Sequence, residues 1–288
     1  MKKLLAVALA ALMLIGCLAS CATNIGDPDA IGNYTPEVKT ITTEKGVFTF
    51  EEAQGDAAIL VGYNGKATKD DHVEIPTHFN GRPVVGIGKE VFYNLAAVVE
   101  VTIPETVTSI DDYAFAGCTE LTTINLPAGT LTIGTAAFQG CTKLESINVG
   151  TALVSIGDYA FMSCPALSDI ELPATLEKIG KYAFAYCAAL PSFEAPEALT
   201  TIGTLAFYNC TGLTSIKLSD NITSIGDFAF VSEKTTFKSI IDMESFTTTP
   251  NEEGELGYVA KYVNAMADTE VEEEADTTVE EADAEAEA

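Results

Sequence analysis

The sequence LSDIELPATLEKIGKYAFAYC, residues 167–187, contains one unit of the repeat that determines the fold. Related units precede and follow it, and the same residue types recur every 23 positions. Among them are Phe92, Phe115, Phe138, Phe161, Phe184, Phe207 and Phe230, and also Cys118, Cys141, Cys164, Cys187 and Cys210. A fixed period of about 20 to 50 residues indicates a solenoid, because no single coil can bury its own apolar side. A coil of 23 residues is too short for a helical hairpin, so we expect strands with short connections.

Each unit predicts two extended segments and a short helical turn. In residues 121–127 (LTTINLP), apolar Ile124 and Leu126 alternate with polar residues, as in a strand with one buried face. A second extended segment follows and is clearest at 107–110 (VTSI). Residues 157–164 (GDYAFMSC) are expected to close the coil as a short helical turn that points phenylalanine and cysteine inward. We therefore expect the phenylalanines and cysteines to form two buried ladders through the stack.

The motif LxxIxLPxxLxxIGxxAFxxC in these units resembles the BspA-type leucine-rich repeat of bacterial surface proteins. The resemblance covers about residues 47–235, and residues 46–65 (GVFTFEEAQGDAAILVGYNG) resemble the N-terminal cap of such arrays, with two strands around a turn. It implies an α/β solenoid, a short right-handed leucine-rich-repeat array of parallel β strands and short helical turns with an N-terminal β cap. It also implies a cell-surface protein that mediates adhesion or protein binding, without implying a particular ligand.

The composition divides the chain into five parts. We expect a lipoprotein signal peptide at 1–21, a linker at 22–46, an N-terminal β cap at 47–74, a solenoid with a C-terminal cap at 75–250, and an acidic, mostly disordered tail at 251–288. The tail has fourteen acidic residues and one lysine, a net charge of −13, and too little apolar surface to offset its ordering entropy. We interpret it as a solvated segment, with weak binding of divalent cations or of a basic partner as alternatives.

Residues 1–21 have the features of a bacterial export signal with a lipid anchor. Lys2 and Lys3 precede twelve apolar residues, 4–15, a run too short for a bilayer, which needs about 20 residues. The sequences LIGC and LASC end at Cys17 and Cys21, and each resembles a lipobox, so either cysteine is a candidate for lipidation. The alternative is an ordinary cleaved signal. An acylated chain would be held in the bacterial cell envelope, on the outer face of a membrane.

The residue inventory argues against several classes of function. The chain has 42 acidic and 15 basic residues, a net charge of −27, whereas nucleic-acid binding needs a basic face. Its two histidines are His72 and His78, and we interpret residues 70–72 (DDH) as a charged turn. No HExxH, CxxC or phosphate-loop motif is present, so we predict no enzyme activity, no cofactor and no metal site.

The five repeated cysteines have two interpretations. Stacked strands lie about 4.8 Å apart, a spacing that would permit disulfides between neighbouring coils. We favour free buried thiols that act as small hydrophobic side chains, because pairing would leave one cysteine over and break the repeat.

Polar residues that flank the inward positions of the first extended segment define the candidate binding face. We expect them to form two columns on the concave sheet of the solenoid. The first column is Glu100, Thr123, Ser146, Asp169, Ser192 and Ser215, and the second is Thr102, Asn125, Asn148, Glu171, Glu194 and Lys217. The alternative is a solvated strand face without a ligand. A third column, Tyr113, Tyr159, Tyr182 and Phe228, is interpreted as packing between turns, with a contact site as the alternative.

Two hypotheses of function follow. In the first, the chain is a lipid-anchored surface module that binds a protein of a host or a neighbouring cell through its strand face. In the second, it is a passive structural protein of the envelope, a spacer without a specific ligand. In both we expect a monomer that is anchored to a membrane by acyl chains and exposed outside the cytoplasm.

Overall fold

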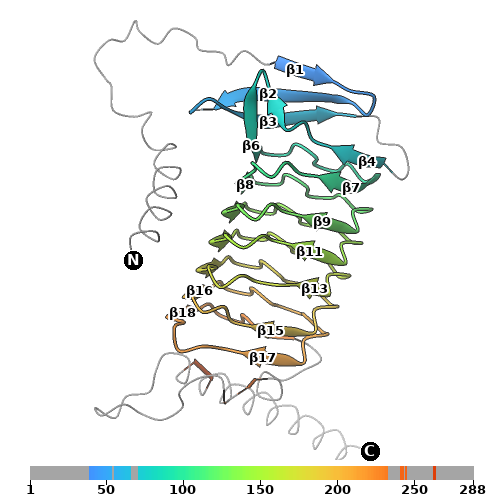
Figure 1. Ribbon diagram of the computed structural model, residues 1–288. Helices are drawn as coiled ribbons and strands as arrows, with labels where there is room; N and C mark the ends of the chain where they lie inside the picture. The colour runs from blue at the N-terminus through green and yellow to red at the C-terminus, as the bar shows by residue number, and fades with distance from the viewer. Residues whose placement is uncertain are drawn as a thin grey trace, which may run out of the picture. The chain divides into compact units, whose positions relative to one another are not determined.

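A computed structural model describes residues 39–53, 55–65 and 71–232, together with 241–242, 244 and 262–263. All of these residues belong to one unit, which begins at Lys39. From β6 to β18 the chain runs in successive parallel coils, and each coil places strands on opposite sides of the stack (Figure 1). Paired residues of neighbouring coils are 23 positions apart, so the predicted period is confirmed.

One side of the stack is a continuous β ladder, and the second extended segment of each unit builds most of it. In spatial order its strands are β1 (Lys39–Thr42), β2 (Val47–Ala53), β3 (Ala57–Asn64), β6 (Arg82–Ile87), β8 (Ser109–Ile110), β10 (Thr132–Ile133), β12 (Ser155–Ile156), β14 (Lys178–Ile179), β16 (Thr201–Ile202) and β18 (Ser224–Ile225). The first three strands are antiparallel, and the pairs that follow are parallel. A short strand, β5 (His78–Phe79), pairs with β6.

The opposite side of the stack comes from the first extended segment of each unit and is divided into three short ladders. They are β4 (Asp71–Glu74) with β7 (Val98–Thr102), then β9 (Thr123–Asn125), β11 (Ser146–Asn148) and β13 (Asp169–Ile170), and finally β15 (Ser192–Glu194) with β17 (Ser215–Lys217). All of these pairs are parallel. The predicted strands are present, but they do not form one sheet.

The N-terminal strands lie within two of the predicted domain ranges, 22–46 and 47–74. The two strands expected within 46–65 are β2 and β3. However, β1 lies in the range 22–46 that we predicted to be a linker, and half-buried Ile41 packs against the core there. Strand β4 lies in the range predicted as a cap, yet it pairs with β7 of the solenoid. The capping role of the β2–β3 hairpin and the right-handed sense of the coil stay predictions.

The segment expected to be a short helical turn is a series of hydrogen-bonded turns, so the helical turns are not confirmed. Successive backbone N–H groups donate alternately to a carbonyl of their own coil and to a carbonyl of the next coil. Ala116 donates to Tyr113 O of its own coil at 3.1 Å, whereas Phe115 donates to Ala137 O of the next coil at 2.7 Å. Tyr113 has a φ of 57° and Gly117 a φ of 75°, and such left-handed residues interrupt an α-helix. The segment therefore joins neighbouring coils as well as closing its own.

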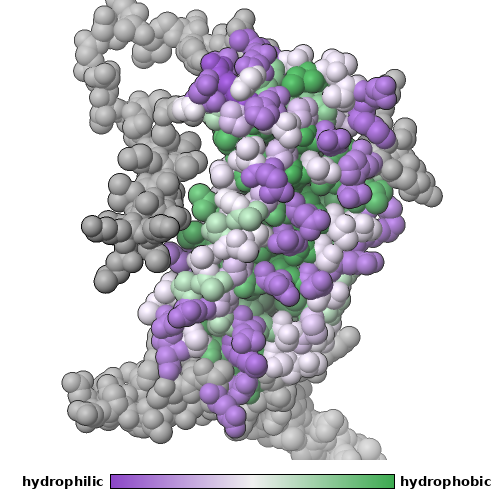
Figure 2. All heavy atoms as spheres, viewed as in Figure 1, coloured by the Kyte–Doolittle hydropathy of each residue, from purple (hydrophilic) through white to green (hydrophobic). Residues whose placement is uncertain are grey.

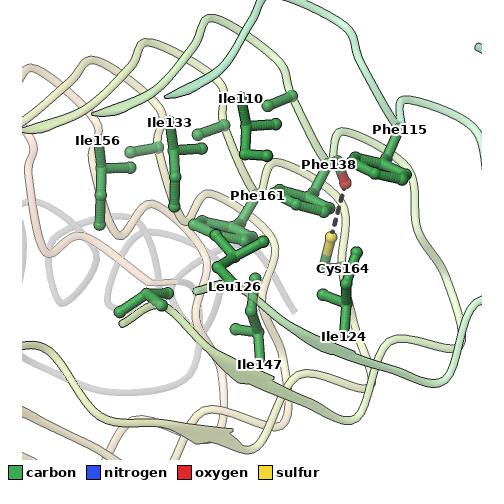
Figure 3. Packing of buried hydrophobic residues seen from close by; sticks show 14 of the residues in the cluster. Ile110, Phe115, Ile124, Leu126, Ile133, Phe138, Ile147, Ile156, Phe161 and Cys164 are labelled. Carbon is green, nitrogen blue, oxygen red and sulfur yellow. Dashed lines mark hydrogen bonds between the residues drawn. The ribbon is translucent and has the colours of Figure 1, made fainter. Parts of the chain in front are cut away.

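The core between the two sides is made of columns of identical residues. Seven phenylalanine rings, from Phe92 to Phe230, stack with centroids 4.9 to 5.3 Å apart and nearly parallel planes. Figure 3 shows three of these rings beside the column of Ile110, Ile133 and Ile156. Aromatic pairs at this spacing contribute about 0.5–1.5 kcal/mol beyond their burial. The inward phenylalanine ladder is therefore confirmed, and it links every coil to the next.

Glycine follows the core isoleucine in most coils because the backbones approach closely there. A Cβ atom at Gly180 would lie 2.5 Å from the backbone nitrogen of Asp158 in the preceding coil. The Asp158 side chain occupies the same region, and its Oδ1 accepts the N–H of Lys181 at 2.8 Å. The glycine column therefore leaves room for a carboxylate that joins two coils.

Candidate binding face

The structure brings the two predicted polar columns onto the side of the stack formed by β7, β9, β11, β13, β15 and β17 (Figure 1). In the first column, Ser146 pairs in register with Thr123 and with Asp169. In the second, Asn148 pairs with Asn125. The side chains are exposed, except for half-buried Ser146 and Ser215. The columns are present as predicted, whereas their role in binding and the concave shape of this side stay predictions.

The face carries both charge and neutral hydrogen-bonding groups. Glu194 and Lys217 are paired in register, with carboxylate and ammonium 3.6 Å apart. Asp169 and Glu171 add exposed carboxylates nearby. Exposed pairs of this kind contribute little to stability, about 0 to 1 kcal/mol, so these charges are available to a partner at small cost to the fold. Figure 2 shows hydrophilic side chains along the length of the stack, with hydrophobic ones between them.

His72 belongs to this face, which the sequence did not indicate. Asp71 and His72 lie in strand β4, so the prediction of a charged turn at 70–72 is wrong for these two residues. The Nδ1 atom of His72 lies 3.0 Å from the Glu100 carboxylate, and its Nε2 lies 3.0 Å from the hydroxyl of Thr102. Register explains both contacts, because β4 pairs with β7 and sets His72 opposite Glu100. The three side chains form one polar cluster at the first coil.

The five described cysteines form a buried ladder of free thiols, as predicted. Each thiol also donates a hydrogen bond that the sequence did not indicate. Cys118 donates to Phe92 O and Cys141 to Phe115 O, at 3.1 and 3.2 Å, and the other three repeat the contact. Burial raises the pKa of the Cys210 thiol to about 12, so this thiol is neutral and unreactive at physiological pH.

The tyrosine column lies on the turn side of the stack. Tyr159 and Tyr182 stack with ring centroids 5.1 Å apart, which supports packing between turns at these two positions. Tyr113 instead meets Tyr93 edge to face at 6.4 Å. Phe228, at the end of the column, is 58% exposed. The column therefore combines packing in its middle with an exposed aromatic ring at one end.

The described residues meet neither the requirements for a metal site nor those for a membrane-spanning helix. Within them, no group of three or more His, Cys, Asp or Glu side chains is placed to hold a metal ion. The same part of the chain contains no helix that is long and apolar enough to cross a membrane. The predicted signal peptide with Cys17 and Cys21, the start of the predicted linker and nearly all of the acidic tail lie outside the described residues.

Comparisons with known proteins agree with the repeat geometry. A family model described as BspA type Leucine rich repeat region matches six copies in this chain, over residues 85–189 and 154–252. The crystal structure of a T. pallidum leucine-rich-repeat protein is similar with a TM-score of 0.54 and 28% identity, over 76% of this chain and 92% of that one. A leucine-rich-repeat protein from Bacteroides ovatus gives a TM-score of 0.52 and 27% identity, over 72% of this chain and 60% of that one. No curated protein matches the sequence.

Proposed function

We propose, from the finding that this chain belongs to the BspA-type leucine-rich-repeat family, that it is a bacterial surface scaffold that binds another protein through its two polar columns. The family match covers more than half of the chain, and solenoids of stacked repeats offer extended surfaces for partners. The ligand is a protein of a host or a neighbouring cell. Adhesion is the consequence of that binding for the cell.

The regular register of the polar columns is the observation that carries this proposal. Thr123, Ser146 and Asp169 stand in adjacent strands, and so do Ser192 and Ser215. Strand spacing of about 4.8 Å therefore sets a fixed distance between neighbouring side chains. A rigid array of hydroxyl, amide and carboxylate groups can form several hydrogen bonds with a partner at little entropic cost.

Lipid anchoring completes the proposal and is supported by the sequence alone. Acylation at Cys17 or Cys21 would hold the chain outside the cytoplasm, with the linker between anchor and solenoid. In this arrangement the hairpin β2–β3 caps the first coil. Family membership favours a scaffold over an enzyme.

Charge reversal tests the binding role. The full chain is immobilised and exposed to matrix proteins and envelope extracts, and each binding partner is then purified and titrated. We expect saturable binding that is lost when Asp169, Glu171 and Glu194 are all changed to Lys. The matched control changes three exposed acids outside the columns, Glu105, Glu177 and Asp227, to Lys and should bind like the wild type. Absence of any partner at micromolar concentration, with the fold intact, would favour the passive spacer instead.

A further inference from the structure

The polar face is interrupted between β13 and β15, and a proline accounts for the interruption. In neighbouring coils, the residue directly after the repeat leucine donates its backbone N–H to a carbonyl group of the preceding coil. Glu145 donates to Thr122 O at 2.9 Å, and Thr214 donates to Pro191 O at 3.0 Å. The position between them is Pro191, which has no N–H and cannot donate to Ser168 O. The ladder stops here, so β13 and β15 end separate ladders.

Two side chains of the same coil widen the interruption. Ala195 stands where other coils have a larger aliphatic residue, such as Leu126. Phe193 replaces the isoleucine of the inward column, and its ring packs against Phe207 at 4.5 Å and Phe230 at 5.8 Å. The ring therefore contacts its own coil and the following one, and among the described residues no ring contact joins it to Phe184 of the preceding coil.

A cleft of about 520 Å³ results between the two coils. Its apolar wall includes Ile170, Leu172, Phe184 and Phe207. Ile170 is half-buried, whereas its equivalent Ile147 is only 4% exposed, so the cleft opens part of the core to solvent. The mouth of the cleft carries three exposed carboxylates, from Glu171, Glu194 and Glu197.

One backbone hydrogen bond between coils is absent at the mouth, and among the described residues it is also absent one coil earlier, where Val149 N–H does not donate to Glu171 O. Leu126 N–H donates to Asn148 O, and Ala195 N–H donates to Lys217 O, both at 2.8 Å. At the equivalent position, and among the described residues, no hydrogen bond joins Leu172 N–H to Glu194 O.

We propose that this cleft binds an apolar side chain of a partner protein that is flanked by basic residues. The apolar wall accommodates the side chain, and the three carboxylates favour Lys or Arg beside it. The acidic tail of this chain, with a net charge of −13, and a second copy, at −27, would both be repelled by the same carboxylates. This proposal rests on the proposed function, because it names the part of the face where a partner is anchored.

A labelled peptide tests the cleft directly. The probe is a fluorescein-labelled pentapeptide with phenylalanine between two pairs of lysines, titrated with the full chain by fluorescence anisotropy. We expect saturable binding that Ala195→Leu weakens by about tenfold or more, because leucine fills the cleft without changing any charge. The control Ala128→Leu places the same side chain at an exposed position of another coil and should leave binding unchanged. Both variants should unfold at or above the wild-type temperature, which shows that the fold is retained.

Other outcomes separate this proposal from the proposed function. Binding that survives Ala195→Leu but is lost with Glu171→Gln and Glu197→Gln would show attraction to acidic groups alone and would overturn the cleft. Equal binding of a peptide with central glycine would also overturn it, as would no saturable binding up to about 1 mM. The protein-binding role is judged separately, by whether the wild-type chain binds any protein partner, an outcome that does not require the cleft.

Discussion

The Sγ atom of Cys164 lies 3.1 Å from the carbonyl oxygen of Phe138 in the preceding coil and donates a hydrogen bond to it (Figure 3). The same oxygen accepts the N–H of Cys141 at 3.2 Å, so two cysteines of successive coils share one carbonyl group. Alanine could fill part of the space but could not donate. This contact gives the cysteine ladder a role beyond packing, because each thiol joins its coil to the one before.

We expect Cys164→Ala to lower the free energy of unfolding by about 2 kcal/mol, since it removes a buried hydrogen bond and leaves a small cavity. Urea unfolding of the full chain, followed by circular dichroism, measures this change. Asn125→Ala serves as the control at an exposed strand position and should change stability by no more than about 0.5 kcal/mol. Equal stability of Cys164→Ala and the wild type would show that the thiol contact contributes nothing.

The raised pKa of Cys210 predicts a loss of stability in alkali. Burial keeps this thiol neutral in the folded chain up to a pKa of about 12, whereas the ordinary value is 9.0. Its contribution is therefore fully present below pH 9 and is lost as the pH rises toward 12. Between about pH 9 and pH 11, Cys210→Val should reduce the decline of the unfolding free energy by about 1.4 kcal/mol per pH unit relative to wild type. Parallel declines of the two proteins would contradict this assignment.

Gly180→Ala should destabilise the chain strongly. The new Cβ would lie 2.5 Å from the backbone of the preceding coil, and backbone atoms of a stacked coil cannot move aside without disturbing the ladder. We expect a loss of about 3 kcal/mol, measured by urea unfolding. Gly129→Ala is the matched control, because no atom lies within 4 Å of its Cβ position. A similar effect of both substitutions would show that the close approach of the coils does not explain the glycine column.

Lipid anchoring predicts how the chain partitions between detergent and water. The wild type should enter the detergent phase of a Triton X-114 separation, because an acyl chain adds about 0.8 kcal/mol per buried CH₂ group. The double variant Cys17→Ala, Cys21→Ala should stay in the aqueous phase. If it partitions like the wild type, acylation at these cysteines is wrong.

The sequence predicts the coil well because the 23-residue period is a physical requirement of stacking. Phe138 must lie above Phe115 if every coil buries the same side, and the structure places their rings 5.2 Å apart. The same reasoning places Ser146 opposite Thr123 in the polar column. A fixed register thus provides both the core and the candidate face.

Other features depend on backbone conformations that the period does not reveal. GDYAFMSC has the composition of a helical turn, yet Tyr159 and Ser163 both have a φ of 61°, because alternate N–H groups bond to the next coil. The cleft follows from departures within a single coil, Pro191, Phe193 and Ala195, which the period of the repeat does not reveal. Pro191 changes no apolar position, so its effect appears only once the donors at that register are known.

Site-specific photocrosslinking on intact cells tests the binding role of the columns most directly. A photoreactive amino acid replaces Asn148, an exposed member of the second column, or Glu177, an exposed residue outside both columns. The account predicts a discrete protein adduct from position 148 that is absent from position 177 and is lost when Asp169, Glu171 and Glu194 are changed to Lys. Adducts of equal yield from both positions, or none from position 148 in cells that display the folded chain, would contradict it.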